Sequence, residues 1–332
     1  MPGGLDRPRQ VLIVGAGLTG AVLAWVAARS RRHPVLLASG RVGGRADSVA
    51  SGVVHGIGPP GEPRTWTSMS DETLRSAARR ARRGWKLLQD VLLSASRPSG
   101  LAECPHALTP PLELDGARIE HLCERLRAAG FGVELDGRDL VNPRDALVQP
   151  RRLTLELLRQ ARTAGAELRF GARLPRSLRA GVSDVSVALD EGERSFDTVF
   201  WTVAHSRPGV PGAIASERQV IVEERLSPGR ARLPKVLGSF DGAIQLAPAP
   251  WFGPDSTLLR IAPGSESGGS AWPQLPAEWS RYAGPARRRS LAVVAGCQSP
   301  ARDRVLALGG LAMWPVTSLI GACEEVVSDE AT

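Results

Sequence analysis

The chain has 332 residues, 42% of them hydrophobic, and a formal net charge of +8 that comes almost entirely from arginine. This composition is ordinary for a globular protein, and the length is enough for two domains. Aromatic residues make up only 5% and no nucleic-acid-binding motif is visible, which argues against a nucleic-acid partner.

No apolar run is long enough to cross a bilayer, and no signal peptide precedes the first predicted strand. We therefore expect a cytoplasmic protein that does not act at a membrane. Its four cysteines, at 104, 123, 297 and 323, are widely spaced and form no C-x-x-C. They favour reduced thiols over disulfides or metal ligands, so we predict no metal site.

The first predicted elements are typical of a nucleotide-binding unit. Residues 10–14 form a short buried strand, and Gly15, Gly17 and Gly20 form the motif G-x-G-x-x-G at the start of a helix. The first glycine allows the tight turn, the second lets the backbone approach a pyrophosphate, and the third lets the helix pack on the strand. Because a second strand follows at 34–38, we predict a βαβ unit; the alternative is a glycine-rich turn in another α/β protein.

The segment after this unit carries a family resemblance. Residues 38–63 are rich in Gly, Ser and Pro and are predicted to be a loop. The run VLLASGRVGGRADSVASGVVHG resembles the glycine oxidase branch of the D-amino-acid-oxidase-like flavoproteins, in its Ser39-Gly40, Gly43-Gly44-Arg45 and 48–52 pieces. The resemblance implies FAD as the cofactor and an α/β fold: a Rossmann-like FAD-binding domain with an inserted antiparallel-sheet substrate domain.

By the same resemblance, FAD contacts the glycine-rich turn, the end of the second strand, the following loop, and three later turns. The cofactor-binding residues implied are Gly15, Ala16, Gly17, Leu18, Thr19, Gly20, Ala38, Ser39, Gly44, Arg45, Ser51, Gly52, Leu174, Val203, Gly309, Gly310 and Leu311. Leu174 falls where the family places an apolar residue against the adenine.

The middle of the chain begins with a basic amphipathic helix over 69–98, capped by Ser70 or Asp71. Its arginines are interpreted as a solvated face, with a surface that attracts an anion or a partner as the alternative. The other predicted elements are helices over 117–129 and 153–164, ended by Gly130 and Gly165, a strand over 167–170, and a hairpin over 185–203.

From residue 208 to 285 the chain is rich in Pro, Gly and Ser and resembles the substrate domain, with strands over 219–223, 236–240, 243–246 and 256–261. A strand over 291–296, a glycine turn at 309–310 and a helix near Pro315 close the chain. The resemblance places the positive end of this helix by the flavin pyrimidine. We predict an FAD-binding domain of residues 8–70, 148–208 and 291–332, and a substrate domain of residues 71–147 and 209–290.

Several positions depart from the family. Ala38 replaces an acidic residue that bonds ribose hydroxyls, which predicts looser FAD binding. Gln298 replaces the arginine that holds the substrate carboxylate, and it has neither the charge nor the bidentate geometry. The only tyrosine is Tyr282, outside the strand where the family has one; Ile244 and Gln245 occupy that place.

Three functions follow. The first is an FAD-dependent oxidase or dehydrogenase that acts on a C–N bond of a small-molecule amine or modified amino acid, with Gln298 and His205 as the candidate catalytic residues. The second is a catalytically degenerate subunit or scaffold that packs on an active partner, so homo- and hetero-oligomers both stay open. The third is an NADP-dependent dehydrogenase, in which Arg41 and Arg45 contact a 2′-phosphate.

Overall fold

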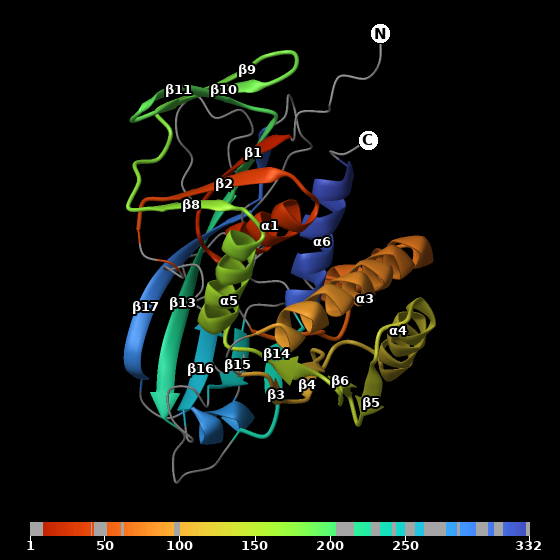
Figure 1. Cartoon of the computed structure of the whole chain (residues 1–332). Coiled ribbons are helices and arrows are strands. Elements are labelled where there is room, and N and C mark those ends of the chain that lie inside the picture. Colours follow the sequence, from red (N-terminus) through yellow and green to blue (C-terminus); the bar gives the residue numbers. More distant parts are fainter. Residues whose placement is uncertain are drawn as a thin grey trace.

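The fold is built on two large sheets, which Figure 1 shows one above the other. The structure is a computed structural model and describes residues 9–40, 42, 52–60, 63–95, 100–203, 216–226, 233–240, 244–249, 256–261, 277–283, 286–296, 305–308 and 315–329. Within these ranges, no helix is both long enough and apolar enough to span a membrane.

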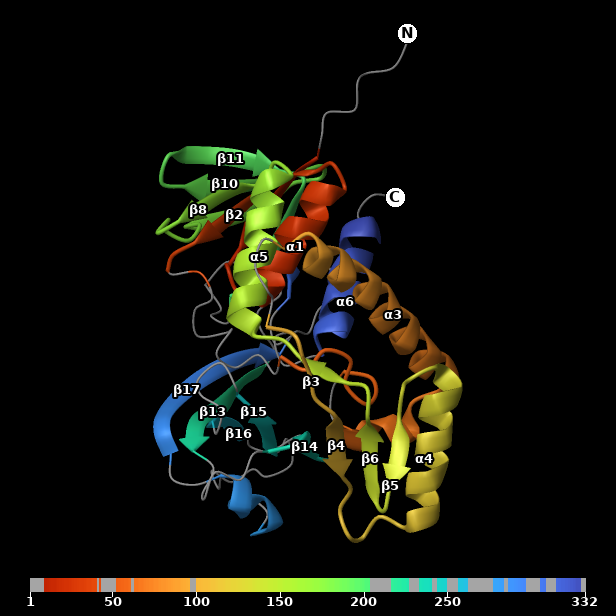
Figure 2. The same ribbon diagram turned by 60° about the horizontal axis from the view of Figure 1, so that its bottom comes forward.

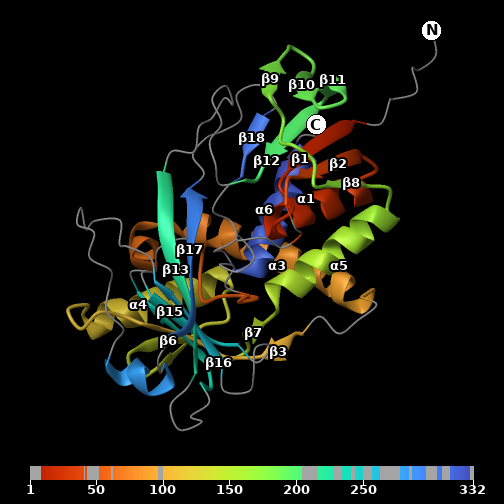
Figure 3. The same cartoon turned by 90° about the vertical axis from the view of Figure 1, so that its left-hand side faces the viewer.

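The first sheet is parallel and has the order β18-β12-β1-β2-β8. Its strands are β18 (Val305–Ala307), β12 (Thr198–Trp201), β1 (Gln10–Val14), β2 (His33–Ala38) and β8 (Glu167–Phe170). Helices α1 (Leu18–Arg29), α5 (Pro150–Thr163) and α6 (Val316–Asp329) cover one face with a continuous apolar core. The three-stranded sheet of β9 (Ser177–Ala180), β10 (Val185–Leu189) and β11 (Gly192–Phe196) covers the other, as Figure 3 shows. This layering confirms the predicted α/β class.

The second sheet has eight strands in the order β17-β13-β16-β15-β14-β4-β6-β5. They are β17 (Ala286–Gly296), β13 (Ser216–Leu226), β16 (Ser256–Ile261), β15 (Ile244–Pro248), β14 (Val236–Ser239), β4 (His106–Thr109), β6 (Asp139–Asn142) and β5 (Glu134–Asp136). All pairs are antiparallel except β14 with β4. Helix α4 (Gly116–Ala129) lies beside β5, which Figure 2 shows, and the short helix η3 (Ala277–Tyr282) packs on the opposite face.

Helix α3 (Asp71–Leu93) connects the two halves. Its N-terminal Leu74 packs in the core under α4, while Leu88 and Val91 pack in the core under the parallel sheet. Ser70 caps it, as predicted, because its side-chain oxygen accepts from the Thr73 N–H at 3.2 Å. Most of its arginines are exposed, but two also contact α6: Arg80 Nε donates to Glu325 Oε2 at 2.7 Å, and Arg83 Nη1 to Glu324 Oε2 at 3.0 Å. The solvated-face interpretation therefore misses a connection between two helices.

The remaining predicted helices and strands are present where the structure describes them, with two differences, and the glycine turn at 309–310 lies outside the described residues. The returning strand of the hairpin is divided between β11 and β12 at Asp197, whose Oδ2 accepts from the Gln10 N–H at 2.6 Å. Residues 291–296 are extended as predicted but do not return to the parallel sheet, because they continue β17 and pair with β13. The division of the chain into domains stays a prediction. Two further segments are β3 (Ala102–Glu103), paired with β7 (Ala146–Leu147), and the short helix η1 (Pro63–Ser68).

Candidate functional site

The turn between β1 and α1 has the geometry of a phosphate-binding loop. Gly15 has φ +115°, a conformation that favours glycine, and its N–H donates to Leu37 O at 2.8 Å. A Cβ at Gly20 would lie 2.0 Å from Gly15 O, so the helix starts directly against the strand. Gly17 caps α1 without any side-chain hydrogen bond. The positive end of the helix dipole thus has no side-chain cap, which fits a pyrophosphate.

The other described cofactor-binding candidates lie at the same edge of the parallel sheet. Ala38 ends β2 and is 5% exposed in the core beneath α1, while Ser39 after it is exposed. Val203 follows β12, and its Cγ1 lies 3.0 Å from where a Cβ of Gly15 would be. Leu174 follows β8 and packs on the cluster that contains the inner residues of β1, β2 and β12. Because the carboxyl ends of parallel strands meet at one edge, the structure brings these residues together.

The rest of the predicted site lies outside the described residues and stays a prediction. This applies to Gly44, Arg45, Ser51, His205, Gln298, Gly309, Gly310 and Leu311. Gly52 is described: its carbonyl accepts from the Val148 N–H at 2.8 Å, and it begins the segment 52–60.

Asp145 fixes the segment 52–60, and the sequence did not predict this role. Its carboxylate is 1% exposed. Oδ1 accepts from the backbone N–H groups of His55 and Ala146, at 2.8 and 2.7 Å, and Oδ2 from that of Gly56 at 2.8 Å. Asn142 Nδ2 adds a bond to Gly56 O at 2.8 Å. A buried carboxylate with three N–H donors is well satisfied, so we assign Asp145 a positioning role.

Two histidines lie beside this carboxylate. The ring of His55 packs edge-on against Trp85, with centroids 4.6 Å apart. His106 is 7% exposed, and neither ring nitrogen has a hydrogen-bond partner in the described part of the chain. Its Nδ1 lies 3.6 Å from Asp145 Oδ2, which is too long for a hydrogen bond but close enough for an ion pair if the ring is protonated.

The N-terminus of α6 meets the same segment. The N–H groups of Val316 and Thr317 donate to the carbonyls of Val53 and Val54, at 2.8 and 3.0 Å, and Thr317 Oγ1 also donates to Val54 O. Two N–H donors of this helix end are thus used inside the protein. The expectation that its positive end lies by the flavin concerns the helix dipole and stays a prediction.

One face of the eight-stranded sheet points toward the segment 52–60. Ala247 of β15 and Val236 of β14 pack with Val53 on this face. Because alternate residues of a strand share a face, and directly paired residues do too, Gln245 and its partner Arg260 lie on the same face. Arg260 is 3% exposed. Gln245 and Arg260 are therefore on the face of the eight-stranded sheet that packs against Val53 of the segment 52–60.

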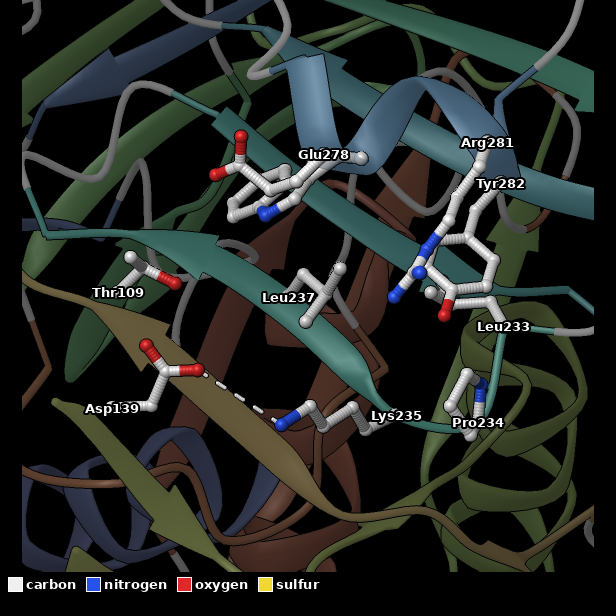
Figure 4. A pocket seen from close by; sticks show the side chains of 10 residues that line it. Thr109, Asp139, Leu233, Pro234, Lys235, Leu237, Glu278, Arg281 and Tyr282 are labelled. Atoms are coloured by element: carbon white, nitrogen blue, oxygen red, sulfur yellow. Dashed lines mark ion pairs between the residues drawn. The ribbon is translucent and has the colours of Figure 1, made fainter. Parts of the chain in front are cut away.

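A separate cavity of about 300 Å³ lies on the opposite face of the sheet, beneath η3 (Figure 4). Lys235 on one side lies 3.9 Å from Asp139 Oδ2, and Tyr282 lines another side. Its apolar wall includes Leu237, which packs in the cluster of Leu246 and hence away from Gln245. This cavity is not part of the cofactor edge, and Tyr282 lies in the short helix η3 and not in a strand, as expected.

The pKa of His55 makes a testable prediction. Burial lowers this pKa below its ordinary value of 6.5, and the Asp145 carboxylate offsets part of the effect. The unfolded chain then binds more protons than the folded one, so stability falls as pH drops through about 6.5. We expect the melting temperature to decrease between pH 7.5 and pH 5.5. The decrease should be smaller in His55→Gln. His121→Gln, on an exposed face of α4, is the matched control and should retain the full wild-type decrease.

Comparisons with known proteins agree with this geometry. No protein of curated function matches the chain by sequence. The family model described as FAD dependent oxidoreductase (DAO) matches residues 10–235.

Three solved structures are similar to the chain. Glycine oxidase from Geobacillus kaustophilus has a TM-score of 0.70 at 15% identity, covering 97% of this chain and 94% of its own. L-alpha-glycerophosphate oxidase from Mycoplasma pneumoniae, with FAD bound, has a TM-score of 0.70 at 12% identity, covering 97% and 95%. NikD, described as an unusual amino acid oxidase essential for nikkomycin biosynthesis, has a TM-score of 0.67 at 13% identity, covering 98% and 95%. These likenesses show the fold, and the family match spans more than half of the chain, which therefore belongs to the FAD dependent oxidoreductases, with FAD as its cofactor.

Proposed function

We propose that this protein oxidises a C–N bond of an amine or modified amino acid. The main support is the phosphate-binding turn at the carboxyl edge of the parallel sheet. The segment 52–60 adds to it, because this segment packs on one face of the eight-stranded sheet through Val53 and bonds to the first turn of α6. Glycine oxidase and NikD, two of the similar structures, are described as oxidases of this kind. When bound, FAD supplies the acceptor for a hydride.

The chain's own residues then bind the cofactor and orient the substrate against it. The turn at Gly15 and Gly17 binds the pyrophosphate, and the segment held by Asp145 separates the cofactor edge from the substrate face. Burial of this face excludes water from the reacting bond. An amine that arrives neutral needs no side-chain base, so the proposal does not depend on His205.

A degenerate subunit that packs on an active partner is the second candidate. Its support is Ala38, where the structure has a buried methyl group in place of the ribose-binding carboxylate, together with Gln298. The NADP-dependent alternative has no support, since the family match is to FAD dependent oxidoreductases.

The visible spectrum of the purified protein tests the proposal. Bands of oxidised flavin, bleached anaerobically by an amine or amino acid, support an oxidoreductase of this class. Flavin that no member of an amine and amino-acid panel reduces would contradict the proposed reaction and favour the scaffold, as would a colourless protein that takes up no added FAD.

The substrate range is a further prediction. Because Gln298 lacks the charge of the family's arginine, we expect poor turnover of glycine, sarcosine and simple D-amino acids. Losing a charged partner for a buried carboxylate costs roughly 2–5 kcal/mol. Oxygen-consumption or dye-reduction assays with the flavin-loaded protein measure this turnover. Gln298→Arg should raise the turnover of the same substrates. Rapid turnover of glycine by the unmodified protein would contradict the prediction.

A further inference from the structure

The cavity beneath η3 combines an apolar floor with charged walls. Leu233 and Leu237 line it and are each 6% exposed, and Trp279 of η3 packs in the same apolar cluster. A volume of about 300 Å³ is at the lower end of the range for ligand sites in proteins and suits a small metabolite. Because the eight-stranded sheet separates this cavity from the segment 52–60, the flavin reaction does not explain its charges.

One side of the cavity carries more negative than positive charge. Asp139 and Glu278 line it, and the Lys235 ammonium is shared between Asp139 and Asp136, at 3.9 and 3.7 Å. Burial raises the pKa of Asp139 above its ordinary value, and a hydrogen bond from Thr109 and the charge of Lys235 offset only part of this. Within the described ranges these three carboxylates have one ammonium between them, so a cationic group of a ligand would be stabilised here.

The other side of the cavity carries a guanidinium. Figure 4 shows Arg281 across the cavity from Asp139, with Leu237 between them. Arg281 Cζ lies 4.7 Å from the centroid of the Tyr282 ring, a cation–π contact that holds the side chain at the cavity. No carboxylate in the described part of the chain forms an ion pair with Arg281. A planar guanidinium in this state can bind an anionic group of a ligand through two parallel hydrogen bonds.

We propose that this cavity binds a small zwitterion, an aliphatic amino acid whose ammonium and carboxylate groups are separated by an apolar spacer. The ammonium group lies by Asp139 and Glu278, the carboxylate by Arg281, and the spacer on Leu237. An α-amino acid carries both charges at one end of the molecule and fits this two-sided arrangement less well. The site does not depend on the proposed function, because the sheet separates it from the cofactor edge.

Calorimetric titration of the full, FAD-loaded chain tests the proposal with probes matched in length. The sets are 4-aminobutanoate with butylamine and butanoate, 5-aminopentanoate with pentylamine and pentanoate, and 6-aminohexanoate with hexylamine and hexanoate. We expect at least one zwitterion to bind about tenfold more tightly than either of its single-charge relatives. Flavin absorbance of the same samples should stay unchanged, since a probe beneath η3 does not contact the cofactor.

Two exposed residues of η3 provide variants that each remove one charged partner. Arg281→Met should weaken the zwitterion about tenfold and leave the alkylamine nearly unchanged. Glu278→Gln should weaken both the zwitterion and the alkylamine and leave the alkanoate unchanged. Arg118→Met and Glu120→Gln, on the exposed face of α4, make the same changes of net charge and should bind as the unmodified chain does.

Three results would overturn the assignment. The first is equal affinity of the zwitterion and both relatives in every set, and the second is zwitterion binding that either η3 variant leaves unchanged. The third is zwitterion binding that shifts or bleaches the flavin bands, which would place the probe at the cofactor edge. Failure of the proposed function is seen separately, as flavin that no amine or amino acid reduces, and does not change these binding results.

Discussion

Gly20→Ala is expected to destabilise the protein by about 3 kcal/mol and to abolish tight FAD binding. In an ordinary helix the same substitution stabilises by up to about 1 kcal/mol, since alanine is the better helix former. Here the sign reverses, because the new Cβ would lie 2.0 Å from Gly15 O and 3.2 Å from Thr202 Oγ1. Backbone cannot move aside as a flexible side chain can, so α1 must shift away from β1 and the phosphate-binding turn opens.

Denaturant unfolding and flavin fluorescence titration measure the two effects. Gly116→Ala is the matched control: Gly116 begins α4, and a Cβ there would meet no atom within 4 Å. It should leave stability unchanged or raise it slightly, with FAD affinity intact. If Gly20→Ala were as stable as the control, the turn would tolerate a side chain. That result would contradict the close approach of α1 to β1.

Much of the fold could be predicted because the signals are local. The G-x-G-x-x-G motif lies between two apolar runs, and β1, α1 and β2 form as expected. Ser70 and Gly130 act at their own helix ends. The strand at 291–296 was located correctly, but its pairing partner could not be predicted, because pairing with β13 depends on residues about 70 positions away and leaves no mark on the apolar pattern of the strand itself.

The site was harder to predict for the same reason. Asp145 bonds to His55 and Gly56, about 90 residues away, and an aspartate in a turn has many other uses. Arg260 did leave a signal: it is the one charged residue in the strand STLLRI. An arginine at an inward position of an otherwise apolar strand is rare enough to mark a buried charge.

The contact between α3 and α6 depends on two glycines, one on each helix. A Cβ at Gly84 would lie 1.8 Å from Thr317 O, and a Cβ at Gly321 would lie 2.2 Å from Arg80 O. Glycine inside a helix costs about 1 kcal/mol relative to alanine. Both positions therefore have a lower helix propensity than alanine would give, but the missing side chains allow the two helix backbones to approach closely. The helices therefore cross backbone against backbone, which places Thr317 where its N–H and hydroxyl bond to Val54.

Gly84→Ala should consequently destabilise the protein by about 3 kcal/mol, again opposite in sign to Gly116→Ala. The free energy of unfolding from denaturant titration measures this. The double variant with Gly321→Ala should lose clearly less than the sum of the two single losses, because either methyl group already separates the helices and the second then meets a widened gap. Additive losses would mean that each glycine is constrained by its own surroundings and not by a shared crossing. Because the displaced helix carries Thr317, the single variant should also increase hydrogen exchange at the amides of Val316 and Thr317, linking this crossing to the segment that faces Arg260.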